Sequence, residues 1–155
     1  MNESHEKRLP YIHSETSEYW EGARRHELLL RRCGSCGQRH FYPRDFCPSC
    51  FSFDVGWTKA SGRGKIYSFT ICHRPAPGFE NDVPYNLALI ELDEGVRMMS
   101  SIVDCPLDEI HIGMAVEVVF DDVTSQVTLP KFRPVQREGE SLQRCSLSKA
   151  PPEAS

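Results

Sequence analysis

The chain has 155 residues, of which 39% are hydrophobic and 26% are charged, and its formal net charge is -4. This length allows one compact domain with a small appended module, and the acidic balance argues against a general binder of polyanions such as nucleic acids. No apolar run approaches the roughly 18 residues that a membrane span needs, and the polar start lacks the apolar core of a secretory signal, so we expect a soluble cytoplasmic protein without membrane contact.

The first regular element is expected to be a short helix. Residues 1–13 are polar and are expected to form a flexible N-terminus, whereas the hydroxyl and acidic residues from Ser14 onward suit a helix start and predict a helix over 14–27. Tyr19 and Trp20 are neighbours on this helix, which is too short to bury both against itself. We expect Tyr19, Trp20 and Arg24 to contact a partner protein, with packing of Trp20 on the module that follows as the alternative.

Four cysteines in two matched pairs indicate a metal site. Cys33 and Cys36 form one Cys-x-x-Cys motif, and Cys47 and Cys50 form the second after an interval of ten residues. Two such turns bring four thiolates to one ion, which predicts a rubredoxin-like zinc ribbon over 28–53. Four thiolates leave no open position for water or substrate, so the zinc is expected to be structural. Iron uses the same ligands and stays open as the alternative metal.

The rest of the chain has the alternation of short strands. Strands are expected at 65–73, 85–92, 96–104, 115–120 and, as an edge strand limited by two prolines, 129–135. We expect Tyr67 to share a face with Phe69, and Phe79 to stand exposed in a proline-rich loop over 74–84. A mainly β protein with these elements predicts a five-stranded OB-fold barrel over 54–135, although other small antiparallel barrels and sandwiches have the same periodicity. The polar residues 136–155 are expected to be a disordered tail.

Two candidate reaction sites fail on their spacing. The segment 61–65, Ser-Gly-Arg-Gly-Lys, lacks the pattern of a phosphate loop, and Ile66 stands where a hydroxyl is needed, so its glycines are assigned to a bend at a barrel corner. Cys72 and His73 are neighbours in a strand and point to opposite faces, which excludes a nucleophile and base pair. No set of residues specifies a reaction, so we expect no catalytic residue in this chain.

The assembled pattern resembles a known family, the acyl-CoA-associated proteins that join a zinc ribbon to an OB-fold and were long catalogued as a domain of unknown function. The resemblance covers about 15–135. It is carried by Tyr19-Trp20-Glu21-Gly22, Leu28 to Cys36, Tyr42-Pro43-Arg44, Cys47-Pro48-Ser49-Cys50, and the segments 62–70, 84–85, 88–92 and 113–118.

Members of this family are small non-catalytic partners of thiolase-fold enzymes, including thiolases, hydroxymethylglutaryl-CoA synthase assemblies and side-chain-cleaving aldolases of steroid degradation. The resemblance implies an accessory subunit of a thiolase-superfamily enzyme that makes or breaks carbon-carbon bonds in acyl-CoA. The length and intact ribbon are similar to the small subunit of a degradative thiolase such as benzoylsuccinyl-CoA thiolase. Within such a complex we expect Arg63, Lys65 and Arg74 to contact the anionic part of acyl-CoA, and Phe79 to cover an apolar part. Solvated surface charge is the alternative for the three cations.

The competing hypothesis is a nucleic-acid-binding protein, because zinc ribbons and OB-folds are both common in transcription and translation. The acidic total and the lack of a basic-aromatic stripe over 65–73 argue against it. A third hypothesis, a self-sufficient acyl-CoA thioesterase, requires a nucleophile or base that the chain does not display.

Overall fold

A computed structural model describes residues 7–135, which contain one helix and eight strands arranged in two antiparallel sheets. The elements are α1 (Ser17–Arg24), β1 (Leu29–Cys33), β2 (Arg39–His40), β3 (Val55–Lys59), β4 (Arg63–Cys72), β5 (Tyr85–Leu92), β6 (Arg97–Ser100), β7 (Ala115–Asp122) and β8 (Thr128–Pro134). One sheet has the order β2-β1-β3 and the other the order β6-β5-β4-β7-β8. The expected tail 136–155, and residues 1–6 of the expected flexible N-terminus, lie outside the described residues.

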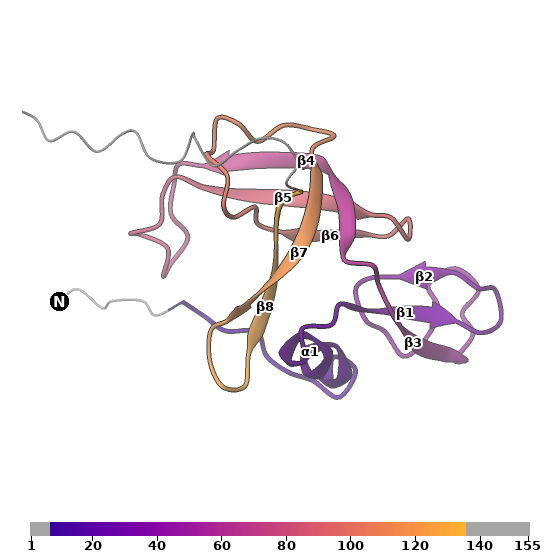
Figure 1. The fold of residues 1–155 in the computed structure, drawn as a ribbon. Helices are drawn as coiled ribbons and strands as arrows, with labels where there is room; N and C mark the ends of the chain where they lie inside the picture. Colours follow the sequence, from indigo (N-terminus) through magenta and orange to yellow (C-terminus); the bar gives the residue numbers. More distant parts are fainter. Residues whose placement is uncertain (1–6, 136–155) are drawn as a thin grey trace, which may run out of the picture.

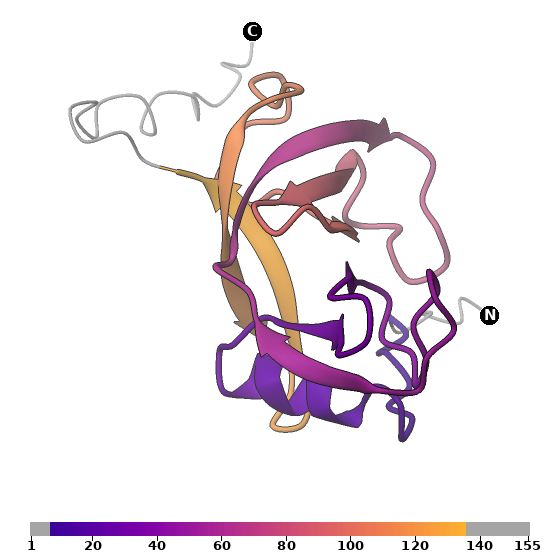
Figure 2. The ribbon, with the colours of Figure 1, turned by 90° about the vertical axis from the view of Figure 1, so that its right-hand side faces the viewer.

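The five-stranded sheet curls round on itself (Figures 1 and 2). The segment after β6 closes the curl on β8, where the amide of Val103 donates to the carbonyl of Phe132 at 2.8 Å and the amide of Phe132 donates to the carbonyl of Ser101 at 3.0 Å. Between these bonds, Ile102 and Phe132 form a parallel bridge. The buried amide of Asn86 on β5 bonds the backbone of Ile102 in both directions, at 2.7 and 2.8 Å. The result is the partly closed barrel of an OB-fold, as expected.

The core lies inside this curl because the inward residues of each strand are apolar. Ala88, Ile90 and Leu92 alternate along β5 and are all buried. Val116 of β7 and Phe132 of β8 belong to the same cluster and have no exposed surface. Burial of each large side chain contributes about 1.5–3 kcal/mol, so this cluster is the main source of stability of the barrel.

A bulge in β4 corrects one expectation from the sequence. The ladder between β4 and β5 shifts between Ile66 and Ser68, which leaves Tyr67 as the extra residue. Ile66 is buried, whereas Tyr67 is 43% exposed and its ring centroid lies 3.6 Å from the guanidinium of Arg97. The expectation that Tyr67 shares a face with Phe69 is therefore wrong, because one inserted residue reverses the alternation.

The helix α1 lies between the small sheet and the barrel (Figure 1), where it contacts β1 on one side and β7 and β8 on the other. It is shorter than the expected 14–27, since His26 adopts a positive φ of 58° and the amide of Glu27 turns back to the carbonyl of Gly22 at 2.8 Å. The strand β3 falls within the range expected for the barrel, yet it pairs with β1 and completes the small sheet. No helix among residues 7–135 is long and apolar enough to cross a membrane.

Candidate metal centre and neighbouring surfaces

Four cysteine side chains converge between two loops of the small sheet. The Sγ atoms of Cys33, Cys36, Cys47 and Cys50 all lie within 4.8 Å of one another, and the pairs Cys33–Cys50 and Cys36–Cys47 are both 3.6 Å apart. Four sulfurs arranged tetrahedrally about zinc at about 2.3 Å are separated by about 3.8 Å, so the cluster fits this ion. The structure therefore brings together the four ligands that the spacing indicates, on a set of thiolates that iron would also accept.

The two loops have the same backbone hydrogen bonds. The amide of Gly37 donates to the carbonyl of Cys33 at 3.0 Å, and the amide of Phe51 donates to the carbonyl of Cys47 at 2.9 Å. In each loop the amide of the first cysteine also donates to the carbonyl five residues later, at 2.9 and 2.8 Å. Gly37 and Phe51 both have positive φ, 75° and 60°. Glycine adopts this conformation without strain, whereas for a residue with a side chain it costs about 1 kcal/mol or more of stability. Only the second loop is therefore strained.

Backbone amides favour negative charge on the two buried sulfurs. The amide of Cys36 lies 3.5 Å from Sγ of Cys33 and lowers the pKa of that thiol. In the second loop the amides of Cys50 and Ser49 lower the pKa of Cys47 to about 6. The thiolate is the form that binds metal, so the backbone favours the binding state at Cys33 and Cys47. At Cys50 the amide of Ser52 lowers the pKa, but the hydrogen bond with Cys36 and burial outweigh it and raise the pKa to about 12. A centre closed by four sulfurs has no position for a substrate, and its role is to hold the loops together.

Arg31 ties the strand β1 to the segment between the two cysteine pairs. Its side chain is 10% exposed, donates to Oδ1 of Asp45 at 2.8 Å and stacks on Trp57, with 4.0 Å between guanidinium and ring centroid. The neighbouring His40 is also buried, and burial lowers its pKa, which favours the neutral ring beside this cation. Arg31 is therefore structural. By contrast, Arg32, Arg39 and Arg44 are exposed and form no ion pair within residues 7–135.

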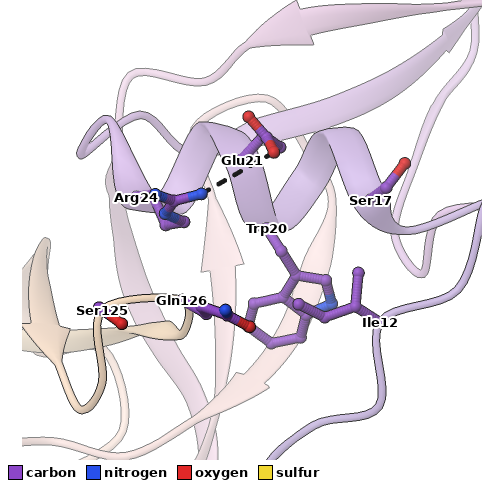
Figure 3. Close-up of a pocket in the computed structure, with 7 residues that line it drawn as sticks. All are labelled: Ile12, Ser17, Trp20, Glu21, Arg24, Ser125 and Gln126. Atoms are coloured by element: carbon purple, nitrogen blue, oxygen red, sulfur yellow. Dashed lines mark ion pairs between the residues drawn. The ribbon is translucent and has the colours of Figure 1, made fainter.

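Tyr19 and Trp20 occupy different environments. Tyr19 is 4% exposed, its ring lies 5.5 Å from that of Phe41, and burial raises its pKa. This position leaves Tyr19 no surface to offer a partner, which removes it from the expected interface. Trp20 and Arg24 line a pocket of about 420 Å³ between α1 and the turn from β7 to β8 (Figure 3). Nε1 of Trp20 is buried without a hydrogen-bond partner among the described residues.

The three cations expected to contact acyl-CoA do not form one site. Arg63 and Lys65 lie at the start of β4, and Arg74 follows its end. A strand of this length extends about 30 Å, so the two groups are far apart. Lys65 is held by Glu91, with 3.3 Å between Nζ and Oε1. Arg63 and Arg74 are exposed and without an ion pair in the part of the chain that the structure describes, so each remains available to an anion.

Phe79 differs from the expectation of a fully exposed ring. It is half-buried, and its ring centroid lies 5.4 Å from that of Tyr85, the first residue of β5. The ammonium group of Lys7 lies 5.3 Å from the ring of Phe79 and 2.6 Å from Oδ2 of Asp82. These contacts fasten the proline-rich loop to the start of the described chain, so the ring has an internal role as well as a partly open surface.

His26 and Asp122 form a pair that no sequence pattern signals, since 96 positions separate them. Nε2 of His26 lies 3.2 Å from both carboxylate oxygens of Asp122, and its ring stacks on Phe120 with 5.1 Å between centroids. The hydroxyl of Thr128 donates to Asp122 at 2.6 Å and, with His26, lowers the pKa of this carboxyl. The hydroxyl bonds the carboxylate and not the imidazole, so the group lacks an activated nucleophile and instead fastens α1 to the barrel.

Family models match both modules. The model described as "ChsH2, rubredoxin-like zinc ribbon domain" covers residues 20–56, and "ChsH2, C-terminal OB-fold domain" covers residues 57–121. In three dimensions the chain is similar to the solved structure "Ltp2-ChsH2(DUF35) aldolase", with a TM-score of 0.73 and 37% identity, over 81% of this chain and 98% of that chain.

Some curated relatives are about as long as this chain, whereas others are considerably longer. A DUF35 domain-containing scaffold protein of Methanocaldococcus jannaschii is 38% identical over 72% of this chain and 84% of its own. A benzoylsuccinyl-CoA thiolase subunit, BbsA, of Thauera aromatica is 30% identical over 63% of this chain and 67% of its own. A probable enoyl-CoA hydratase alpha subunit of Thermomonospora curvata is 37% identical over 85% of this chain, which spans 41% of that protein.

Proposed function

The chain belongs to the DUF35 family, whose members join a ChsH2-type zinc ribbon to an OB-fold, and on this premise we propose that it is a non-catalytic accessory subunit of a thiolase-superfamily enzyme acting on acyl-CoA. Relatives named as an aldolase component, a thiolase subunit and a hydratase alpha subunit support a role within a larger assembly. The reaction in such an assembly is thiolytic or aldol-type cleavage, or the reverse condensation. The catalytic cysteine is supplied by the partner.

The observation that carries this proposal is the closed metal centre. Within residues 7–135, the four cysteines are the single group of three or more potential metal-ligating side chains. A tetrathiolate centre does no Lewis-acid chemistry, and the pair His26 and Asp122 activates no nucleophile. A metal centre without an open position supports a scaffold role for this chain. Reduced thiols at this site suit the cytoplasm, where we place the complex.

The outer face of β4, β5 and β6 supports a protein partner over nucleic acid. Lys65 and Arg97, two of the three cations on these strands, are both held by Glu91 at 3.3 and 3.0 Å. The strands also present Leu87 and Met99, which are 38% and 66% exposed. Binding of single-stranded nucleic acid to an OB-fold relies on free cations beside stacking rings, whereas on these strands Arg97 covers the ring of Tyr67 and only Arg63 has no ion pair within residues 7–135.

Direct contact with acyl-CoA is part of the proposal, through Arg63 and Arg74 acting at separate points. Within residues 7–135 neither guanidinium group forms an ion pair, so both can bind phosphate oxygens. We expect Arg63→Ala or Arg74→Ala to raise the KM of the assembled enzyme for acyl-CoA about tenfold or more at unchanged subunit stoichiometry. The control is Arg133→Ala, which removes an exposed arginine already paired with Glu117 at 2.9 Å and should leave KM unchanged. If KM is unchanged in all three variants, direct contact is excluded.

The accessory role itself is tested by purification of the native chain from its own cells. We expect a thiolase-superfamily protein to copurify in stoichiometric amount, and the isolated chain to turn over no acyl-CoA. Turnover by the pure chain, or copurification with RNA polymerase or ribosomal proteins in place of such an enzyme, would overturn the proposal.

A further inference from the structure

Three phenylalanines surround the second cysteine pair of the ribbon, and we call Phe46, Phe51 and Phe53 the knuckle patch. Phe51 is 71% exposed and Phe53 is 81% exposed, while Phe46 is half-buried with its ring centroid 6.5 Å from that of Phe53. Large aromatic rings this open gain little from the fold of the chain that carries them. The patch therefore needs an explanation outside the folding of the ribbon.

The backbone conformation of Phe51 also indicates that the knuckle patch has a role outside the folding of the ribbon. Phe51 occupies the position that Gly37 occupies in the first loop, with the same hydrogen bond to the first cysteine and a positive φ of 60°. A glycine would make the same turn without strain, as the first loop demonstrates. The second loop thus keeps a side chain where the backbone disfavours one and where the ring is open to solvent. Backbone strain that lowers stability, at a position where glycine would avoid it, indicates a functional requirement.

We propose that the knuckle patch is the docking surface through which this chain binds the catalytic thiolase-superfamily subunit, by inserting Phe51 and Phe53 into an apolar pocket rimmed by carboxylates. The inference rests on the proposed accessory function, since it names the surface that serves it. A ribbon held by metal presents these rings in fixed positions, and a phenylalanine has few rotamers to lose, so little conformational entropy is lost on docking.

Exposed arginines of the ribbon are the reason for placing carboxylates around the partner's pocket. Arg32 and Arg39 face each other directly across β1 and β2, which is unfavourable for like charges without an anion between them. Together with Arg44 they are exposed and form no ion pair with the residues that the structure describes. Carboxylates of a partner would relieve this repulsion, because arginine binds them in bidentate geometry.

The same charges disfavour a second copy of this chain as the occupant of the patch. In a symmetric dimer the patch would meet its own copy, and the unpaired arginines of both copies would be brought together. Single-stranded nucleic acid also uses open rings beside free cations, so its binding is one of the outcomes that the test below separates. A protein surface with local carboxylates supplies both an apolar pocket and anions, and aromatic and arginine residues are the usual anchors of such interfaces.

The test uses Phe51→Gly in the full chain, with Phe53→Ser as a second variant whose fold does not depend on the strained position. The thiolase-superfamily protein that copurifies with the native chain is produced alone, and its Kd for each variant is measured by titration calorimetry. We expect both variants to bind at least 30-fold more weakly than the native chain. Phe51→Gly should keep stoichiometric metal and a Tm within about 3 °C of the native value, because glycine suits the turn.

The matched control is Asp104→Gly, which makes the same kind of replacement at another residue of positive φ, 55°, in the barrel and away from the ribbon. It should bind with native affinity. If the native chain binds the enzyme and both phenylalanine variants bind equally well, the docking role of the knuckle patch is refuted, and the proposed accessory function is unaffected. If no thiolase-superfamily protein copurifies with the native chain, both proposals fail. A loss of self-association, of binding to single-stranded DNA or of binding to anionic vesicles in Phe51→Gly, with enzyme binding intact, also overturns the assignment.

Discussion

Replacement of Gly64 by alanine tests whether the glycine-rich segment 61–65 shapes the barrel or holds a ligand. Gly64 lies where β4 is paired with β5 on one side and β7 on the other. A Cβ atom at this position would lie 2.4 Å from the carbonyl oxygen of Glu91 and 3.0 Å from Cα of Leu92. Both atoms belong to the backbone, so no side-chain rotation relieves the contact and β4 must move away from β5.

Overpacking that displaces backbone costs about 1–3 kcal/mol, which for a chain of this size lowers Tm by roughly 3–10 °C. Calorimetric unfolding of Gly64→Ala should show this loss. The control is Gly56→Ala in β3, where a Cβ meets no atom within 4 Å and Tm should be unchanged or slightly higher. A native Tm for Gly64→Ala would refute the structural assignment and return a ligand-binding role to the segment.

Three further changes probe the metal centre, the helix and the pH dependence. Cys36→Ser should lose the metal and the order of the ribbon while the barrel keeps its amide protection, as read by elemental analysis and NMR hydrogen exchange; a stoichiometric metal in the variant would contradict this. Tyr19→Ala should lower stability by about 3–5 kcal/mol in denaturant unfolding, whereas a value below about 1 kcal/mol would show that the ring is not part of the core. Asp122 has a pKa below its ordinary value, so its contribution to stability is present above the unfolded pKa of about 4 and is lost as pH falls through the folded pKa. Asp122→Asn should therefore flatten the acid side of a curve of Tm against pH, and an unchanged curve would exclude this contribution.

Local patterns predicted the elements that depend on local chemistry. The expected strand 85–92 coincides with β5, because a proline precedes it, Gly95 turns the chain after it with a φ of 80°, and its apolar residues alternate between. The cysteine cluster follows from two loops whose geometry is set within six residues each. Such features require no knowledge of distant contacts.

The features that escaped prediction depend on distant pairing or on a single inserted residue. Tyr67 faces outward because of a bulge that alternation cannot reveal. The separation of Arg63 from Arg74, by contrast, was already implied by the expected strand over 65–73, which lies between them. Tyr19 is buried by contact with Phe41, which lies 22 positions further along the chain. The unusual position of Phe51 was visible in the sequence. The first loop reads Cys-Gly-Ser-Cys-Gly and the second reads Cys-Pro-Ser-Cys-Phe, so a phenylalanine stands where the first loop has glycine.

Reconstitution of activity is the most direct test of the accessory role. The copurifying thiolase-superfamily protein is assayed for thiolytic or aldol-type cleavage of acyl-CoA alone and after addition of this chain in equimolar amount. We predict little activity from the enzyme alone, none from this chain alone, and recovery of full kcat on mixing, with saturation at a fixed subunit ratio. Full activity from the enzyme alone, unchanged by addition of this chain, would contradict the account.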